Sequence, residues 1–136
     1  MIDTYLVPAN TRVTAKGDGP AIDISGAVHR VFLLHLEIQN IIEQESLDIS
    51  VFGSIGEPAG WETKPLVSFP QKFYRGQHPL LLDLSTRPDI VMIRAHWEVN
   101  RWGRGTETPM FEFHVQVKEI PAEVFHEAIA EAKSLA

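Results

Sequence analysis

The chain has 136 residues, which is the usual size of one domain with a single hydrophobic core. Hydrophobic residues make up 44% of it and charged residues 22%, a composition that is ordinary for a globular protein and too apolar for a disordered one. The formal net charge of −6 provides no field that would draw the chain to nucleic acid or to an anionic membrane, and the absence of cysteine excludes disulfides, thiolate metal sites and cysteine nucleophiles.

The N-terminal stretch MIDTYLVPAN lacks the basic and apolar regions of a signal peptide. The longest apolar runs, VFLLHLEI and IVMI, are too short to span a membrane. We therefore expect a cytoplasmic or particle-associated protein that has no membrane partner.

Between residues 11 and 118 the chain reads as short strands separated by turns such as GDGP (17–20). Apolar and polar residues alternate in most of these segments, which is the pattern of strands with one buried face. In RVFLLHLEIQ, Phe32 and Leu34 fall on one face and His35 and Glu37 on the other. The expected strands before the last pair lie at residues 11–16, 21–25, 30–39, 47–52, 65–70, 72–74 and 78–85.

The last two predicted strands, 90–99 and 110–118, show the strongest alternation. Trp97 lies on the apolar face of the first strand, and we expect it in the core. The glycine-rich connection RWGRGTETP (101–109) predicts a hairpin that pairs the two strands. Together, the short alternating strands predict an antiparallel β-sandwich of jelly-roll type, formed by one domain over residues 1–136.

Residues 121–135 change to helical periodicity. Pro121 occupies a position that the first turn of a helix tolerates. Apolar side chains then recur at the spacing of one helical stripe: Phe125, Ala128, Ile129, Ala132 and Leu135. We expect an amphipathic C-terminal helix whose stripe packs on the sandwich of its own chain or on a neighbouring subunit.

Three short motifs each project a histidine and a glutamate from one face of a strand, because residues i and i+2 of a strand point the same way. These pairs are His35 with Glu37, His96 with Glu98, and Glu112 with His114. In the predicted hairpin, His96 lies opposite His114 or Glu112, depending on the register.

Three interpretations of these motifs are open. Imidazole and carboxylate ligands suit zinc, manganese or iron, which would make the chain a metal-dependent, cupin-like enzyme. The same residues can form polar cross-strand pairs on an outer face, or an interface whose assembly depends on pH. Since the alternate positions form the core face, we favour an outer surface and predict no cofactor. No catalytic motif is complete: HEAIA (126–130), for instance, lacks the second histidine of a zincin.

Aromatic and basic residues gather in the predicted loops, where Trp61, Tyr74, Trp102 and Arg104 are the candidates for ligand contact. Exposed aromatic residues of β-sandwiches can stack on sugar rings, so a carbohydrate-binding module is the alternative function. The same side chains could stack on the bases of single-stranded nucleic acid, but the negative charge of the chain makes such a partner unfavourable.

Two segments resemble β-sandwich structural and decoration proteins of tailed-phage particles. LDISVFGSIGEPAGWET (47–63) is similar to their strand–turn–Trp unit, and IVMIRAHWEVNRWGRGTETPMFEFHVQV (90–117) is similar to their closing hairpin. The matching positions are Leu47, Ile49, Val51, Ser54 and Trp61, then Arg94, Gly103, Pro109, Phe111, Phe113 and Val115. The resemblance covers roughly the central two-thirds of the chain, and the turn GEPAGW, the long RWGRGTET segment and the C-terminal helix depart from it. It implies a non-enzymatic building block that works through protein–protein contact.

Apolar residues on otherwise polar strand faces agree with that implication: Val31, Leu33, Phe52, Ile90, Met92 and Met110. The interface candidates are Val31, Leu33, Phe52 and Met92 on strands, and Phe125 and Ile129 on the predicted helix. A homo-oligomer of closed symmetry would cover such residues. We therefore expect a structural or interaction module that assembles with its own copies through a sheet face, the C-terminal helix, or both.

Overall fold

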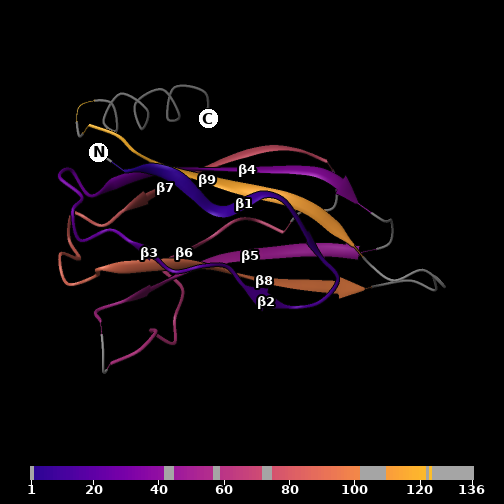
Figure 1. Ribbon diagram of the computed structural model, residues 1–136, viewed down its shortest axis with the longest axis horizontal. Coiled ribbons are helices and arrows are strands. Elements are labelled where there is room, and N and C mark those ends of the chain that lie inside the picture. The colour runs from indigo at the N-terminus through magenta and orange to yellow at the C-terminus, as the bar shows by residue number, and fades with distance from the viewer. Residues whose placement is uncertain are drawn as a thin grey trace.

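The computed structural model describes residues 2–41, 45–56, 59–71, 75–101, 110–121 and 123. Within these residues two antiparallel sheets form two layers (Figure 1). The strands are β1 (Asp3–Val13), β2 (Gly17–Asp18), β3 (Ile22–Asp23), β4 (Val31–Ile41), β5 (Glu45–Ser54), β6 (Val67–Ser68), β7 (Gly76–Asp83), β8 (Met92–Arg101) and β9 (Phe111–Glu119). The described part of the chain contains no helix long and apolar enough to cross a membrane. The helix predicted at 121–135 lies outside the described residues, apart from Pro121 and Glu123.

The four-stranded sheet has the order β1–β9–β4–β7, and the five-stranded sheet has the order β2–β8–β5–β6 with β3 also paired to β8. Residues 17 and 18, which the GDGP pattern assigned to a turn, form β2 beside Trp97 and His96. Glycine gives the backbone room here, because a Cβ atom at Gly17 would come within 3.1 Å of the Trp97 indole nitrogen, which is a tight contact. The turn signal therefore marks a close approach of the backbone to the Trp97 side chain.

The core lies between the two sheets and is formed by the alternate residues that the sequence predicted. In β9, Phe113, Val115 and Val117 are fully buried, and the residues between them face outward. Trp97 is 8% exposed, and its ring meets that of Phe113 edge-on with 5.6 Å between centroids, so the predicted core position of Trp97 is confirmed. Burial of each such side chain contributes about 1.5–3 kcal/mol before the loss of conformational entropy is counted.

Two residues predicted on outer faces are buried instead. Val31 is 3% exposed and Ile90 is fully buried. Both lie at or shortly before the first residue of a strand, and their backbone oxygens are bonded to distant residues: that of Val31 accepts from the N–H of Ile120, and that of Ile90 accepts from the Arg30 side chain. Val31 is therefore not available as an interface residue, and that prediction was wrong.

The predicted hairpin between 90–99 and 110–118 is also wrong. β8 pairs with β5, β2 and β3 in one sheet, whereas β9 pairs with β1 and β4 in the other. The alternation of apolar residues determines which face of a strand is buried but does not choose its partner. The connection at 102–109, which we read as a hairpin loop, lies outside the described residues.

Strand β1 begins at Asp3, well before the first predicted strand. It contains Pro8, which removes a hydrogen-bond donor, and Asn10, whose φ of 63° lies in the left-handed region. The register with β9 shifts between Val7 and Thr11, so the strand is irregular where these residues occur. Such a segment does not alternate cleanly, which is why its sequence did not indicate a strand.

One buried carboxylate fastens the N-terminus and a loop to the end of β9. Glu119 is 1% exposed and accepts hydrogen bonds from the backbone N–H groups of Ile2 at 3.0 Å, Val28 at 2.8 Å and His29 at 2.6 Å. Burial by itself raises the pKa of Glu119, but these backbone donors outweigh it and hold the pKa below its ordinary value. The carboxylate is therefore charged, and it replaces the water that these donors would otherwise bind.

Candidate functional site

The six histidine and glutamate candidates are divided between two faces of the molecule. His35, Glu37, Glu112 and His114 lie on strands of the four-stranded sheet, whereas His96 and Glu98 lie on β8 in the five-stranded sheet. They alternate with buried residues, so each set lies on the outer side of its own sheet. The arrangement of His96 beside His114 or Glu112 is therefore wrong.

On the outer face of the four-stranded sheet the candidates pair separately. His114 and Glu37 are opposite each other across β9 and β4, with 3.1 Å between Nε2 and Oε2. Glu112 instead lies 3.7 Å from Arg12, and His35 lies opposite Gln116 on β9. Within the described residues, no three or more histidine, cysteine or acidic side chains are grouped so that they could hold a metal ion.

The outer face of the five-stranded sheet carries a different arrangement. His96 is opposite Asp18 of β2, and its Nδ1 lies 2.9 Å from a carboxylate oxygen of Asp18. The other ring nitrogen, Nε2, lies 3.6 Å from Glu98. The hydrogen bond with Asp18 orients the imidazole ring on the sheet, and Glu98 places a second carboxylate near its other side.

Arg94, two residues before His96, stacks on an aromatic side chain. Its guanidinium carbon lies 4.3 Å from the centroid of the Trp61 ring, which is the geometry of a cation–π contact. Phe52 is opposite Arg94 on β5 and meets the His96 ring edge-on, with 5.8 Å between centroids. We name Phe52, Trp61, Met92, Arg94 and His96 the Arg94–Trp61 cluster.

Trp61 reaches this face because the segment after β5 folds back on its own strand. The Ser54 hydroxyl donates to the carbonyl oxygen of Gly60 at 2.9 Å and accepts from the backbone N–H of Gly56 at 3.0 Å. Gly56 and Gly60 have φ of 101° and 72°, in the left-handed region that glycine adopts without strain. A bridge between Ser54 and Trp61 then places the indole beside β5.

The charge of Arg94 is only partly compensated. Within the part of the chain that the structure describes, its Nε atom is buried and has no hydrogen-bond partner, and a carboxylate oxygen of Asp18 lies 3.8 Å away. That distance is too long for a hydrogen bond. An arginine that is stacked, partly desolvated and incompletely paired is suited to bind a further acceptor.

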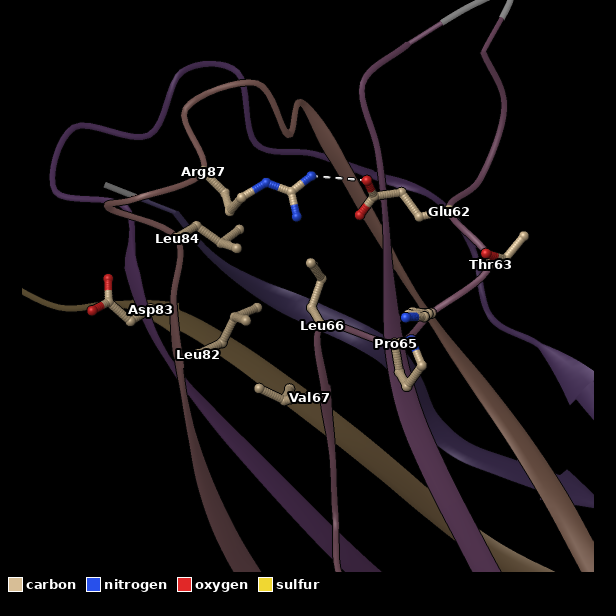
Figure 2. A pocket seen from close by; sticks show the side chains of 10 residues that line it. Glu62, Thr63, Pro65, Leu66, Val67, Leu82, Asp83, Leu84 and Arg87 are labelled. Carbon is tan, nitrogen blue, oxygen red and sulfur yellow. Dashed lines mark hydrogen bonds and ion pairs between the residues drawn. The ribbon is translucent and has the colours of Figure 1, made fainter.

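A second feature is a cleft of about 410 Å³ at the seam between the edge strands β6 and β7 (Figure 2). Leu66 and Val67 face Leu82 and Leu84 across it, and the ion pair between Arg87 and Glu62 crosses one end (Figure 2). The cleft lies where the two sheets do not join, so its walls belong to different layers.

Two charged groups of this seam cleft, Arg87 and Glu62, are paired with each other. Arg87 donates to Glu62 at 2.8 Å and to Asp89 at 3.1 Å, and the bonds to Asp89 and Glu62 raise the pKa of Arg87. The loop that carries Arg87 is held by Arg30, which donates to the carbonyl oxygens of Arg87 at 2.9 Å and Ile90 at 2.7 Å. We interpret the cleft as a stabilised sheet edge and not as a binding site, since Arg87 and Glu62 are bonded to each other across one end of it.

Among the predicted ligand residues, Trp61 lies in the cluster, whereas Tyr74, Trp102 and Arg104 lie outside the described residues. Among the interface candidates, Phe52 and Met92 belong to the cluster and Leu33 lies on the opposite face; Phe125 and Ile129 are outside the described residues. Sequence reasoning missed Arg94 as a site residue and Asp18 as its neighbour. The alternation in residues 90–99 predicted Arg94 on the same outer face as His96 but gave it no role in a site, and nothing local connects Asp18 to either residue.

Comparisons with models of protein families and with curated proteins give no match to this chain.

Proposed function

We propose that this chain is a non-enzymatic structural or interaction module of jelly-roll type, which assembles with further copies of itself through the Arg94–Trp61 cluster. The strand order supports the jelly-roll assignment. β2 and β3 lie along the same strand, β8, and can be counted as one interrupted strand. The eight strands then have the order 1–8–3–6 in one sheet and 2–7–4–5 in the other, which a double Greek key produces.

The observation that carries the proposed interface is the stacked pair of Arg94 and Trp61 with Phe52 and Met92 beside it. Tryptophan and arginine are the residues that contribute most to binding at protein interfaces, and phenylalanine and methionine are enriched there. His96, with its two carboxylate neighbours, provides a polar rim. Such a surface is suited to burial against another protein.

A second copy fits this surface because the surface carries both charges. Arg94 is cationic, and Asp18 and Glu98 are anionic, so a twofold axis can bring the arginine of each copy to the carboxylates of the other. Addition of strands to the four-stranded sheet is disfavoured, since its edge strands β1 and β7 contain Pro8 and Pro79. The resemblance to phage structural proteins favours the same class of function.

The test is the mass of the native chain and of Arg94→Glu, measured by light scattering on a sizing column. We expect the native chain to be oligomeric and the variant to be monomeric, because loss of a central arginine contact weakens binding by about 2 kcal/mol or more, roughly thirtyfold in Kd. Arg75→Glu changes the same charge at an exposed position outside the cluster and is the matched control. A monomeric native chain, or an Arg94→Glu variant that keeps the native mass at equal thermal stability, overturns the proposal.

Glycan binding at the same cluster is the second candidate function. Trp61, Arg94 and Asp18 combine an aromatic ring with a donor and an acceptor for sugar hydroxyls, all on one rigid sheet face. A glycan array would then give hits for the native chain that Trp61→Ala removes and Arg75→Glu retains. An array without hits excludes this candidate and leaves the assembly proposal unaffected.

A further inference from the structure

The outer face of the four-stranded sheet has an apolar hollow that its polar surroundings do not explain. The hollow measures about 460 Å³ and is lined by Leu33 of β4 and by Pro79, Leu80 and Leu81 of β7. Leu33 and Leu81 are opposite each other in the register of the two strands. Both are half-buried.

The alternation of both strands places this leucine pair on the solvent side. The next residues along, Leu34 and Leu82, are 0% and 2% exposed and belong to the core between the sheets. Leu33 and Leu81 therefore point the other way. Apolar side chains that line a hollow on an outer face are stabilised when another apolar group fills the space, because contact with water is then removed.

The chain leaves the sheet beside this hollow. Near the end of β9, Lys118 is opposite Leu33, and Glu119 is opposite Phe32. The next residue, Ile120, donates its backbone N–H to Val31 at 2.9 Å. β9, β4 and β7 are neighbours in the same layer (Figure 1), so the chain ends its last strand only one strand away from the hollow.

The residues that follow have the pattern that the hollow requires. Phe125 and Ile129 are four positions apart, and Leu135 continues the same predicted stripe. A helix over 121–135 would be about 22 Å long at about 1.5 Å per residue, which is comparable with the length of a strand such as β7. A segment tethered so close to its target has an effective concentration in the millimolar range, far above that of a second copy in dilute solution.

We infer that residues 124–135 of the same chain cover the outer face of the four-stranded sheet by placing Phe125 and Ile129 in the hollow formed by Leu33, Pro79, Leu80 and Leu81. Leu33 then packs within the chain and is not an interface residue. The inference does not depend on the proposed function, because the Arg94–Trp61 cluster lies on the other sheet.

The absence of cysteine makes a disulfide test direct. The double variant Leu81→Cys with Ile129→Cys, oxidised in dilute solution, is expected to form a disulfide within one chain, identified by peptide mass after digestion without reduction. The control pair is Gln77→Cys with Ile129→Cys. Gln77 has the outward orientation of Leu81 but lies four residues along β7, about 13 Å away, beyond disulfide reach of the same position.

Labelling gives a second measurement that does not require disulfide geometry. In the otherwise native chain, a maleimide should modify Leu81→Cys at least about tenfold more slowly than Gln77→Cys, and addition of Phe125→Asp should remove most of that protection. A disulfide between two chains instead of within one would assign the hollow to a second copy and overturn the inference. Fast labelling of Leu81→Cys that Phe125→Asp does not change would overturn it as well. Neither result alters the light-scattering test of Arg94→Glu.

Discussion

Replacement of the buried carboxylate at Glu119 should destabilise the protein strongly. Its oxygens accept from three backbone N–H groups, those of Ile2, Val28 and His29, at 2.6–3.0 Å. A hydrogen bond to a charged group is worth about 1.5–3 kcal/mol, and a buried donor left without a partner costs about 1–3 kcal/mol. The amide of Glu119→Gln keeps one acceptor oxygen but directs an N–H group at another donor. We therefore expect a loss of about 3 kcal/mol in the free energy of unfolding, against a typical total of about 5–15 kcal/mol.

The same change should remove a dependence of stability on pH. The pKa of Glu119 in the folded chain lies below its ordinary value of 4.5. Above that value the carboxylate is ionised in both states, and its full contribution is present. As the pH falls from 4.5 towards the lower pKa of the folded state, the unfolded chain takes up the proton first and the contribution declines. The difference in stability between the native chain and Glu119→Gln should therefore be largest near neutral pH and shrink in acid.

Urea unfolding at pH 7 and at several values below 4.5 measures both effects. With a slope of about 1.5–2 kcal/mol per M, the midpoint at pH 7 should fall by about 1.5–2 M. Glu112→Gln is the matched control, since its ion pair with the exposed Arg12 at 3.7 Å is worth less than about 1 kcal/mol. Two results would refute the assignment of Glu119 as a charged acceptor that holds the N-terminus and the loop at 28–29. One is an equal loss in the free energy of unfolding for the two variants, and the other is a stability difference between the native chain and Glu119→Gln that stays constant with pH.

Two further changes test the packing between the sheets. Gly53→Ala should lower the free energy of unfolding by about 1–3 kcal/mol, because its Cβ atom would lie 2.9 Å from Leu66 and 3.0 Å from Ile90. The control Gly26→Ala, whose Cβ atom would have nothing within 4 Å, should stay within about 0.5 kcal/mol of the native chain. Similar melting temperatures for the two variants would contradict this packing. Trp97→Ala should lower the free energy of unfolding by about 3–5 kcal/mol and reduce the near-ultraviolet circular dichroism. A variant that unfolds at the same urea concentration as the native chain would contradict the core position of Trp97.

The buried face of each strand could be predicted from the sequence, but the strands that pair with it in a sheet could not. Alternation identified Phe113 and Val115 as core residues, and both are fully buried. It could not show that β8 and β9 belong to different sheets, because each strand needs only an apolar surface to face, and either sheet provides one. The hairpin was inferred from sequence proximity, which is a tendency of β-proteins and fails where the chain crosses from one layer to the other.

The candidate site depended on the same missing information. Asp18 and His96 are 78 residues apart and come together only because β2 pairs with β8. Asp18 stood in a segment that its glycines marked as a turn, so no local pattern assigned it to a strand. The stacking of Trp61 on Arg94 likewise depends on the hydrogen bonds of the Ser54 hydroxyl with Gly56 and Gly60, which no local pattern in the sequence indicated.

The alternation of apolar and polar residues predicts that a side chain points outward, but it does not predict what packs on that side chain. Leu33 and Arg94 were both predicted on outer faces, and both are there. Their surroundings separate them: Leu33 borders an apolar hollow one strand from the end of β9, whereas Arg94 stacks on Trp61 among charges of both signs. An apolar hollow one strand from the end of β9 is filled more readily by the residues that follow β9 in the same chain, because their effective concentration there is high. A mixed polar and aromatic surface is better suited to a second molecule. The two outer faces should therefore respond oppositely to dilution, the contact at Leu33 being retained and the contact at Arg94 being lost.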